Sequence, residues 1–122
     1  SDKRAQASSH LPGTLVKLRV DRGQAVKAGE VLAEVQSQAF LTLQLDLLKE
    51  HLSTELLSAQ HKSLLAAGNA AAKRRLIDVE GALASARTRR ESLRQQLLVT
   101  GLLESDIAAL TSTGRPVPSV PV

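Results

Sequence analysis

Two long stretches with helical spacing, separated by a two-residue break, most constrain how this chain can fold. The first runs from about residue 38 to 67 and the second from about 70 to 100, and neither contains proline. Gly68 and Asn69 lie between them, and these two residue types most readily adopt the left-handed conformation that ends helices. Two helices of similar length joined so tightly pack antiparallel. The sequence therefore predicts a long α-helical hairpin.

Apolar residues recur at intervals of three and four in both stretches, so each predicted helix carries an apolar stripe. In the second stretch this is a heptad pattern that only Arg90 interrupts. The predicted hairpin core consists of Leu41, Leu45, Leu48, Leu52, Leu76, Val79, Leu83, Leu93 and Leu97. A buried, unpaired carboxylate is costly, so Leu52→Asp or Leu83→Asp should unfold this hairpin.

The segment before the hairpin, residues 13–36, has a different pattern. Apolar residues alternate at Leu18 and Val20, and glycines stand where tight turns would fall. We predict short β-strands there, with the turns at Gly13, Gly23 and Gly29. Residues 1–12 are polar and are expected to form a lead-in linker, and Ser37 is the expected N-cap of the first helix.

The chain after residue 100 predicts a short third helix and an extended tail. Acidic residues lie in the first turn of a helix at about 104–112, where the helix dipole favours them. The prolines in residues 113–122 favour an extended return segment. The expected fold class is mainly α with a small β part.

The composition excludes several functions. The net charge of +4 suggests nucleic-acid binding as one possible function. However, Phe40 is the only aromatic residue available for stacking on bases, and acidic residues alternate with the basic ones. A solvated, charged helix face is therefore the favoured interpretation of the basic residues. The absence of cysteine removes thiolate chemistry and disulfides. His51 and His61 are weak metal candidates, and at about 15 Å apart along one helix they cannot share an ion. We identify no catalytic or cofactor-binding residues.

The chain has no apolar run long enough to cross a bilayer and no visible signal peptide. Its polar beginning and proline-rich end predict that it is a piece of a longer protein, with sequence missing before Ser1 and after Val122.

The pattern Leu18-x-Val20-x-x-Gly23-x-x-Val26-x-x-Gly29-x-x-Leu32-x-x-Val35 resembles one half of a biotinyl/lipoyl domain. Carriers of that family attach their cofactor to a lysine in the turn that joins the two halves. Here Val35 is followed by Gln-Ser-Gln-Ala-Phe, and the next lysine is Lys49, inside the predicted helix. The resemblance therefore implies no attached cofactor.

A half-motif that runs directly into a helical hairpin resembles the periplasmic adaptor proteins of tripartite efflux pumps, the membrane fusion or HlyD-like family. The resemblance implies a hairpin inserted in a split biotinyl/lipoyl-like β domain, whose second half would begin at residues 117–122. It implies a non-catalytic, self-associating subunit that links an inner-membrane RND transporter to an outer-membrane channel in the periplasm of a Gram-negative bacterium. Residues 97–110 are similar to the third helical element of the heavy-metal RND branch, which implies heavy-metal cation efflux.

Many such adaptors dock on the channel through an Arg-x3-Leu-x6-Ser pattern at the hairpin tip. Arg94, Leu98 and Ser105 match this spacing, but they follow the second helix. We therefore assign docking to the predicted tip, which comprises Ala67, Gly68, Asn69 and Ala70.

Two alternatives remain from the sequence: a lipoyl/biotinyl-like carrier subunit of an enzyme, and a basic coiled-coil binding module. Exposed strand edges would direct self-association to residues 13–35 and 117–122.

Overall fold

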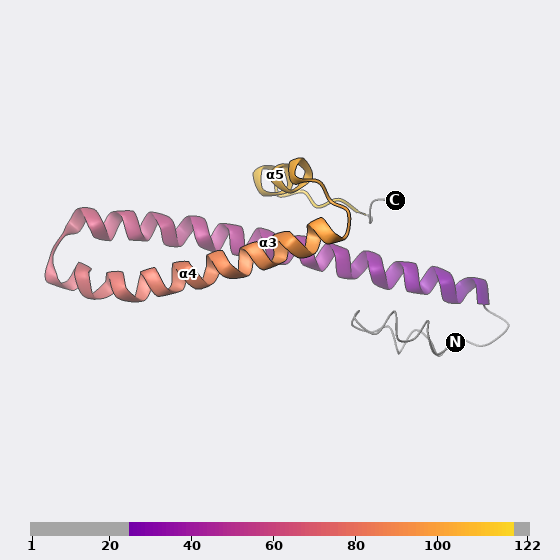
Figure 1. The fold of residues 1–122 in the computed structure, drawn as a ribbon, viewed down its shortest axis with the longest axis horizontal. Coiled ribbons are helices and arrows are strands. Elements are labelled where there is room, and N and C mark those ends of the chain that lie inside the picture. The colour runs from indigo at the N-terminus through magenta and orange to yellow at the C-terminus, as the bar shows by residue number, and fades with distance from the viewer. Residues whose placement is uncertain (1–24, 119–122) are drawn as a thin grey trace.

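The computed structural model describes residues 25–118, which form three helices (Figure 1). Helix α3 spans Ala25–Ala67, α4 spans Ala70–Val99 and α5 spans Glu104–Thr113. With 43 and 30 residues, α3 and α4 are about 65 and 45 Å long. They run antiparallel from a shared tip, and α5 packs on α3 at the other end of the hairpin, which we call the base.

The break at the tip follows from the chemistry of its two residues. Gly68 has a φ of +67°, which glycine reaches without a steric clash, and its N–H donates to the carbonyl of Leu64. Asn69 then caps α4, because its side-chain oxygen accepts the N–H of Ala72 at 2.8 Å. One helix therefore ends and the next begins within two residues.

The first helix begins earlier than predicted, and this corrects the expected β segment. Residues 25–36 belong to α3, Gly29 lies inside that helix and not in a turn, and Ser37 is not a helix cap. The described residues contain no strand, so the prediction of a hairpin inserted in a split biotinyl/lipoyl-like β domain is wrong for this part of the chain. Gly13, Gly23 and residues 13–24 lie outside the described residues.

The physical reason is that residues 25–36 satisfy both patterns. Val31, Leu32 and Val35 are spaced as well for a helix as for short strands, and the alanines and glutamates between them favour a helix. Extending an existing helix costs little compared with nucleating one, so the long helix that follows can propagate toward its N-terminus.

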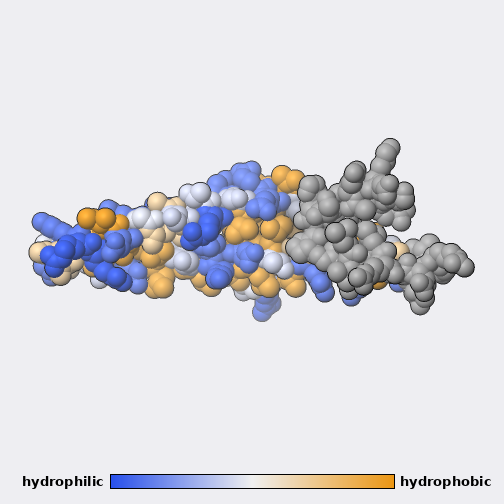
Figure 2. All heavy atoms as spheres, turned by 90° about the horizontal axis from the view of Figure 1, so that it is seen from below, coloured by the Kyte–Doolittle hydropathy of each residue, from blue (hydrophilic) through white to orange (hydrophobic). Residues whose placement is uncertain are grey.

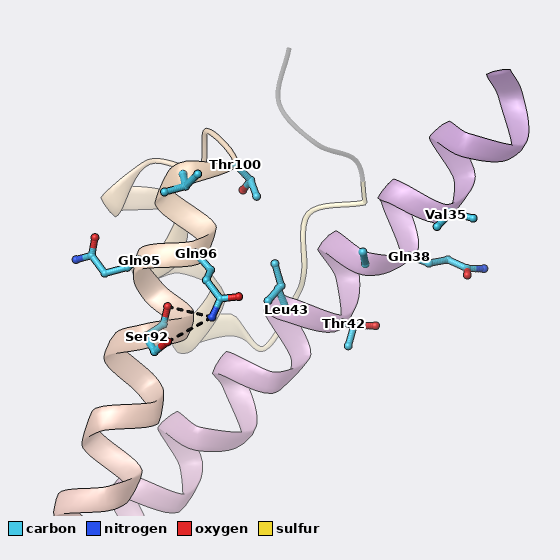
Figure 3. A pocket seen from close by; sticks show the side chains of 10 residues that line it. Val35, Gln38, Thr42, Leu43, Ser92, Gln95, Gln96 and Thr100 are labelled. Atoms are coloured by element: carbon cyan, nitrogen blue, oxygen red, sulfur yellow. Dashed lines mark hydrogen bonds between the residues drawn. The ribbon is translucent and has the colours of Figure 1, made fainter. Parts of the chain in front are cut away.

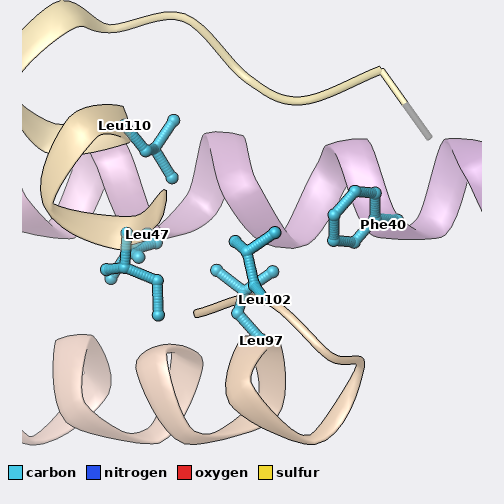
Figure 4. Packing of buried hydrophobic residues seen from close by; sticks show 6 residues of the cluster. Phe40, Leu47, Leu97, Leu102 and Leu110 are labelled. Atoms are coloured by element: carbon cyan, nitrogen blue, oxygen red, sulfur yellow. The ribbon is translucent and has the colours of Figure 1, made fainter. Parts of the chain in front are cut away.

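The core lies at the base, where all three helices meet (Figure 4). Phe40 and Leu47 of α3 face Leu97 of α4, while α5 and the turn before it add apolar side chains from the third side. The cluster consists of Phe40, Leu47, Leu97, Leu102, Ile107 and Leu110. Toward the tip the packing thins to single side chains such as Val79, Leu83 and Ala86.

Burial on α3 differs from the predicted core by a rotation of the helix. Leu41, Leu45 and Leu52 are 39%, 47% and 59% exposed, so their assignment to the hairpin core was wrong. The buried positions are Val35, Phe40, Gln44, Leu47 and Thr54. A shift of one residue turns a helix by about 100°, so a neighbouring stripe of the same period faces inward. Val79, Leu83 and Leu97 are buried, while Leu48, Leu76 and Leu93 are partly buried.

The buried stripe of α3 could not be recognised in the sequence, because polar residues interrupt its apolar pattern. Gln44 and Thr54 interrupt it, yet both satisfy their hydrogen bonds inside the protein. The hydroxyl of Thr54 donates to the carbonyl of Glu50 at 2.7 Å within its own helix.

We expect Leu83→Asp to lower the free energy of unfolding by several kcal/mol, because it places an unpaired carboxylate in a buried position. Leu52→Asp should change it by less than about 0.5 kcal/mol, because Leu52 is exposed. Urea denaturation of dilute protein, followed by helical circular dichroism, measures both. Equal losses in the two variants would contradict the rotation of α3 described above.

Candidate docking site

The tip of the hairpin presents small, uncharged residues to solvent. Ala67, Gly68, Asn69 and Ala70 are all exposed, as the prediction of a docking tip requires. Lys73, Arg74 and Arg75 follow on the first turns of α4 and are exposed as well, and hydrophilic side chains cover much of this end in Figure 2. A partner that binds the tip would therefore meet small, uncharged residues and, beside them, the basic side chains of Lys73, Arg74 and Arg75.

Two polar side-chain contacts join α3 to α4 along the rod. The guanidinium of Arg89 donates from Nε to both carboxylate oxygens of Glu50, at 3.1 and 3.2 Å. Nearer the tip, Nε2 of His61 lies 3.0 Å from Oε2 of Glu80. Exposed pairs of this kind contribute only tenths of a kcal/mol, but they fix which residues of the two helices lie level.

His51 and His61 do not converge on a metal site. His51 lies 3.8 Å from Glu55 on its own helix, and His61 has Glu80 as its carboxylate partner across the hairpin. Within residues 25–118 no three metal-ligating side chains come together.

The residues that match the docking pattern of adaptors lie at the base. Arg94 donates to Glu91 at 2.9 Å and also to Glu104 at the start of α5. Leu98 packs against the base core, and Ser105 is exposed in the first turn of α5. Arg94 therefore joins α4 to α5, at the opposite end of the rod from the tip.

A buried glutamine holds the return segment on α3. Gln44 is fully buried, and its Nε2 donates to the carbonyl of Val117 at 2.9 Å. Its Oε1 accepts the N–H of Val117 at 2.7 Å. The side-chain amide thus pairs with the Val117 backbone much as a neighbouring strand would. We call this two-bond contact the Gln44 clasp.

A groove of about 870 Å³ opens at the base, where α4 ends and α3 continues (Figure 3). Its apolar wall includes Val35, Leu43 and Val99, and amides and hydroxyls complete the lining. None of the described residues that line the groove has a titratable side chain, so this part of the lining offers apolar contacts and neutral hydrogen bonds.

No protein-family profile, curated protein or solved structure matches this chain significantly. None of the described helices combines the length and the apolar character that crossing a membrane requires.

Sequence reasoning located the tip but missed the contacts at the base. The Gln44 clasp joins residues 73 positions apart, and Arg94 meets Glu104 across a turn. One signal was present: Gln44 lies at helical spacing between two large apolar residues, Phe40 and Leu47.

We expect Gln44→Leu to destabilise the protein by about 1–3 kcal/mol, because the N–H and carbonyl of Val117 lose their buried partner. Amide hydrogen exchange at Val117 should accelerate. In a Gln44→Glu variant the carboxylate cannot donate, but once protonated it can make both bonds again. Protection at Val117 should therefore recover on acidification in this variant and not in the leucine variant. Equal protection in the two variants at every pH would contradict the clasp.

Stability should depend on pH through Glu91. The hydrogen bonds from Arg94, followed by that from Gln95, lower the pKa of Glu91 from 4.5 to about 2. The folded state therefore binds this proton less readily than the unfolded state. The contribution is complete above pH 4.5 and is lost as the pH falls toward 2.

The melting temperature of the wild type should exceed that of Glu91→Gln at neutral pH, and the difference should vanish near pH 2. Because Glu91 is exposed, we expect the difference to be small. A difference that stays constant across this range would contradict the assigned role.

Proposed function

We propose that this chain is a non-catalytic assembly module, the α-helical hairpin of a periplasmic adaptor protein of the HlyD-like family. The observation that carries this proposal is the geometry of the rod. The described chain begins at the end of α3 that lies away from the tip and ends just after Val117, which contacts Gln44 at the base. Among residues 25–118, no segment other than the ends of α3 and α4 lies at the tip (Figure 1). A hairpin that spans the distance between two partners needs both connections at one end and a free docking surface at the other.

The surface chemistry supports binding. The tip carries small neutral residues, and the described residues that line the groove at the base are uncharged. Glu50 and Arg89 form an ion pair between the two helices along the rod. A helix surface of this kind suits contact with other helices.

Several contacts at the base hold the helices and the return segment together. The cluster around Phe40 and Leu47, the Gln44 clasp and the Arg94–Glu104 ion pair join α3, α4, α5 and the return segment. In the proposed pump the base would face the inner-membrane RND transporter and the tip would meet the outer-membrane channel. This role implies the periplasm of a Gram-negative bacterium.

We further propose heavy-metal cations as the exported substrate class. The support is the similarity of residues 97–110 to the third helical element of the heavy-metal branch, and these residues comprise the end of α4, the turn and most of α5. The exported cation need not touch the hairpin, because an adaptor connects the two membrane proteins that conduct it.

The test is a photo-crosslink in cells. A benzophenone side chain placed at Ala70, on the tip, should crosslink to the outer-membrane channel of the same pump, and mass spectrometry of the product identifies the partner. The matched control is Ala109, an exposed alanine on α5 at the base, which should not reach the channel. Channel crosslinks from Ala109 and none from Ala70 would contradict the assigned orientation.

A further inference from the structure

Helix α3 continues past the end of α4 and keeps an apolar stripe there. The Glu50–Arg89 ion pair places Val99, the last residue of α4, level with about residue 40 of α3. Among the described residues, no helix lies beside the part of α3 that precedes this level (Figure 1). Its apolar stripe, with intervals of three and four residues, consists of Ala28, Val31, Leu32 and Val35.

This stripe is nevertheless shielded from solvent. Val35 is 5% exposed, and the other three members are half-buried. Glu30 and Glu34, which lie on other faces of the same turns, are exposed. A residue as deeply buried as Val35 is in contact with several others, and the described helices do not reach the whole stripe. Another segment of protein therefore lies against it.

The stripe leads directly into the groove at the base. Val35 belongs to both, and the groove continues along α3 to Leu43 and along the end of α4 to Val99 (Figure 3). Its described lining also offers three side-chain amides, those of Gln38, Gln95 and Gln96. An amide of this kind already holds an extended backbone at the base, in the Gln44 clasp. Stripe and groove thus form one continuous surface that suits an extended apolar segment.

We propose that residues 15–20, which precede the described part of the chain, cover this surface in an extended conformation. Val16, Leu18 and Val20 alternate there with Lys17 and Arg19. An extended segment turns successive side chains to opposite faces. The three apolar side chains therefore lie against the stripe and the groove, and the two basic ones point to solvent. This matches a surface whose described lining is apolar and uncharged.

The length of the connection fits this placement. Residues 21–23, Asp-Arg-Gly, have the composition of a turn, and α3 begins at Ala25. An extended chain advances about 3.3 Å per residue and a helix about 1.5 Å, so two residues of the segment span about four of the helix. A chain that turns back at 21–23 therefore brings Leu18 level with Val35, and Val16 level with the groove.

This placement attaches both connections of the hairpin to α3. Gln44, which holds the return segment, is two positions from Thr42, which lines the groove, so the two attachments lie on different sides of the helix. The groove is then closed by the chain itself and is not a site for a small ligand. The inference does not depend on the adaptor role, but in an adaptor both connections would move with the rod as one body.

The absence of cysteine in the chain makes the test direct. Val16→Cys is combined with Val99→Cys in one full-length protein and with Leu41→Cys in a matched control. Val99 lines the groove, whereas Leu41 is exposed at the same height but two positions from Ala39, a lining residue, and so lies on another side of α3. Dilute protein is treated with a short thiol crosslinker, and mass spectrometry of the digested monomer and dimer separates links within a chain from links between chains.

We expect the 16–99 link within one chain to exceed the 16–41 link by roughly tenfold, because docking raises the effective concentration of the two thiols. Adding Leu18→Ser to the 16–99 protein should lower the yield toward that of the control, because Leu18 faces α3. Adding Lys17→Ser should leave the yield unchanged, because Lys17 faces solvent.

Three outcomes would overturn the proposal: equal yields of the two links, equal effects of the two serine variants, or a 16–99 link found chiefly between chains. The last result would assign the groove to a second copy of the protein. None of them bears on the photo-crosslink at the tip, so failure of this docking and failure of the adaptor role can be told apart.

Discussion

Burial of apolar side chains at the base is the constraint on which the rest of the structure depends. Helix α3 carries two apolar stripes of nearly the same period, and either could face α4. The stripe of Phe40 and Leu47 is chosen because α5 and the turn before it bring Leu102, Ile107 and Leu110 against it from a third side. Three elements bury more apolar surface there than two helices alone could, and that surplus sets the rotation of α3.

Polar contacts contribute alignment more than bulk stability. The Gln44 clasp orients the return segment, Arg94 ties α5 to α4, and the Glu50–Arg89 and His61–Glu80 pairs set the register of the hairpin. Most of these pairs are exposed and therefore weak. Each contact nevertheless favours the observed alignment of the helices over other alignments that would bury a similar apolar area. The hairpin therefore has one register, and α5 and the return segment have one orientation at the base.

The rotation of α3 also decides what the protein can offer to partners. By turning Phe40 and Leu47 inward it turns Leu41, Leu45, Leu52 and Leu56 outward. The hairpin therefore has a row of exposed apolar side chains on α3 and small, uncharged residues at its tip.

The sequence by itself determined the helices and the tip. Residues 38–100 contain no proline, their apolar residues recur at intervals of three and four, and Gly68 and Asn69 interrupt the helical pattern. Each of these features acts locally, on the few residues around it. It did not determine the secondary structure of residues 25–36, whose spacing suits a strand and a helix equally, or which leucines lie inside. Only the tertiary structure decided those, because the choice between equal stripes depends on α5 and Val117, which lie far along the chain. The local spacing of apolar residues determines that α3 is a helix. Which face of that helix is buried depends on contacts with residues far along the chain.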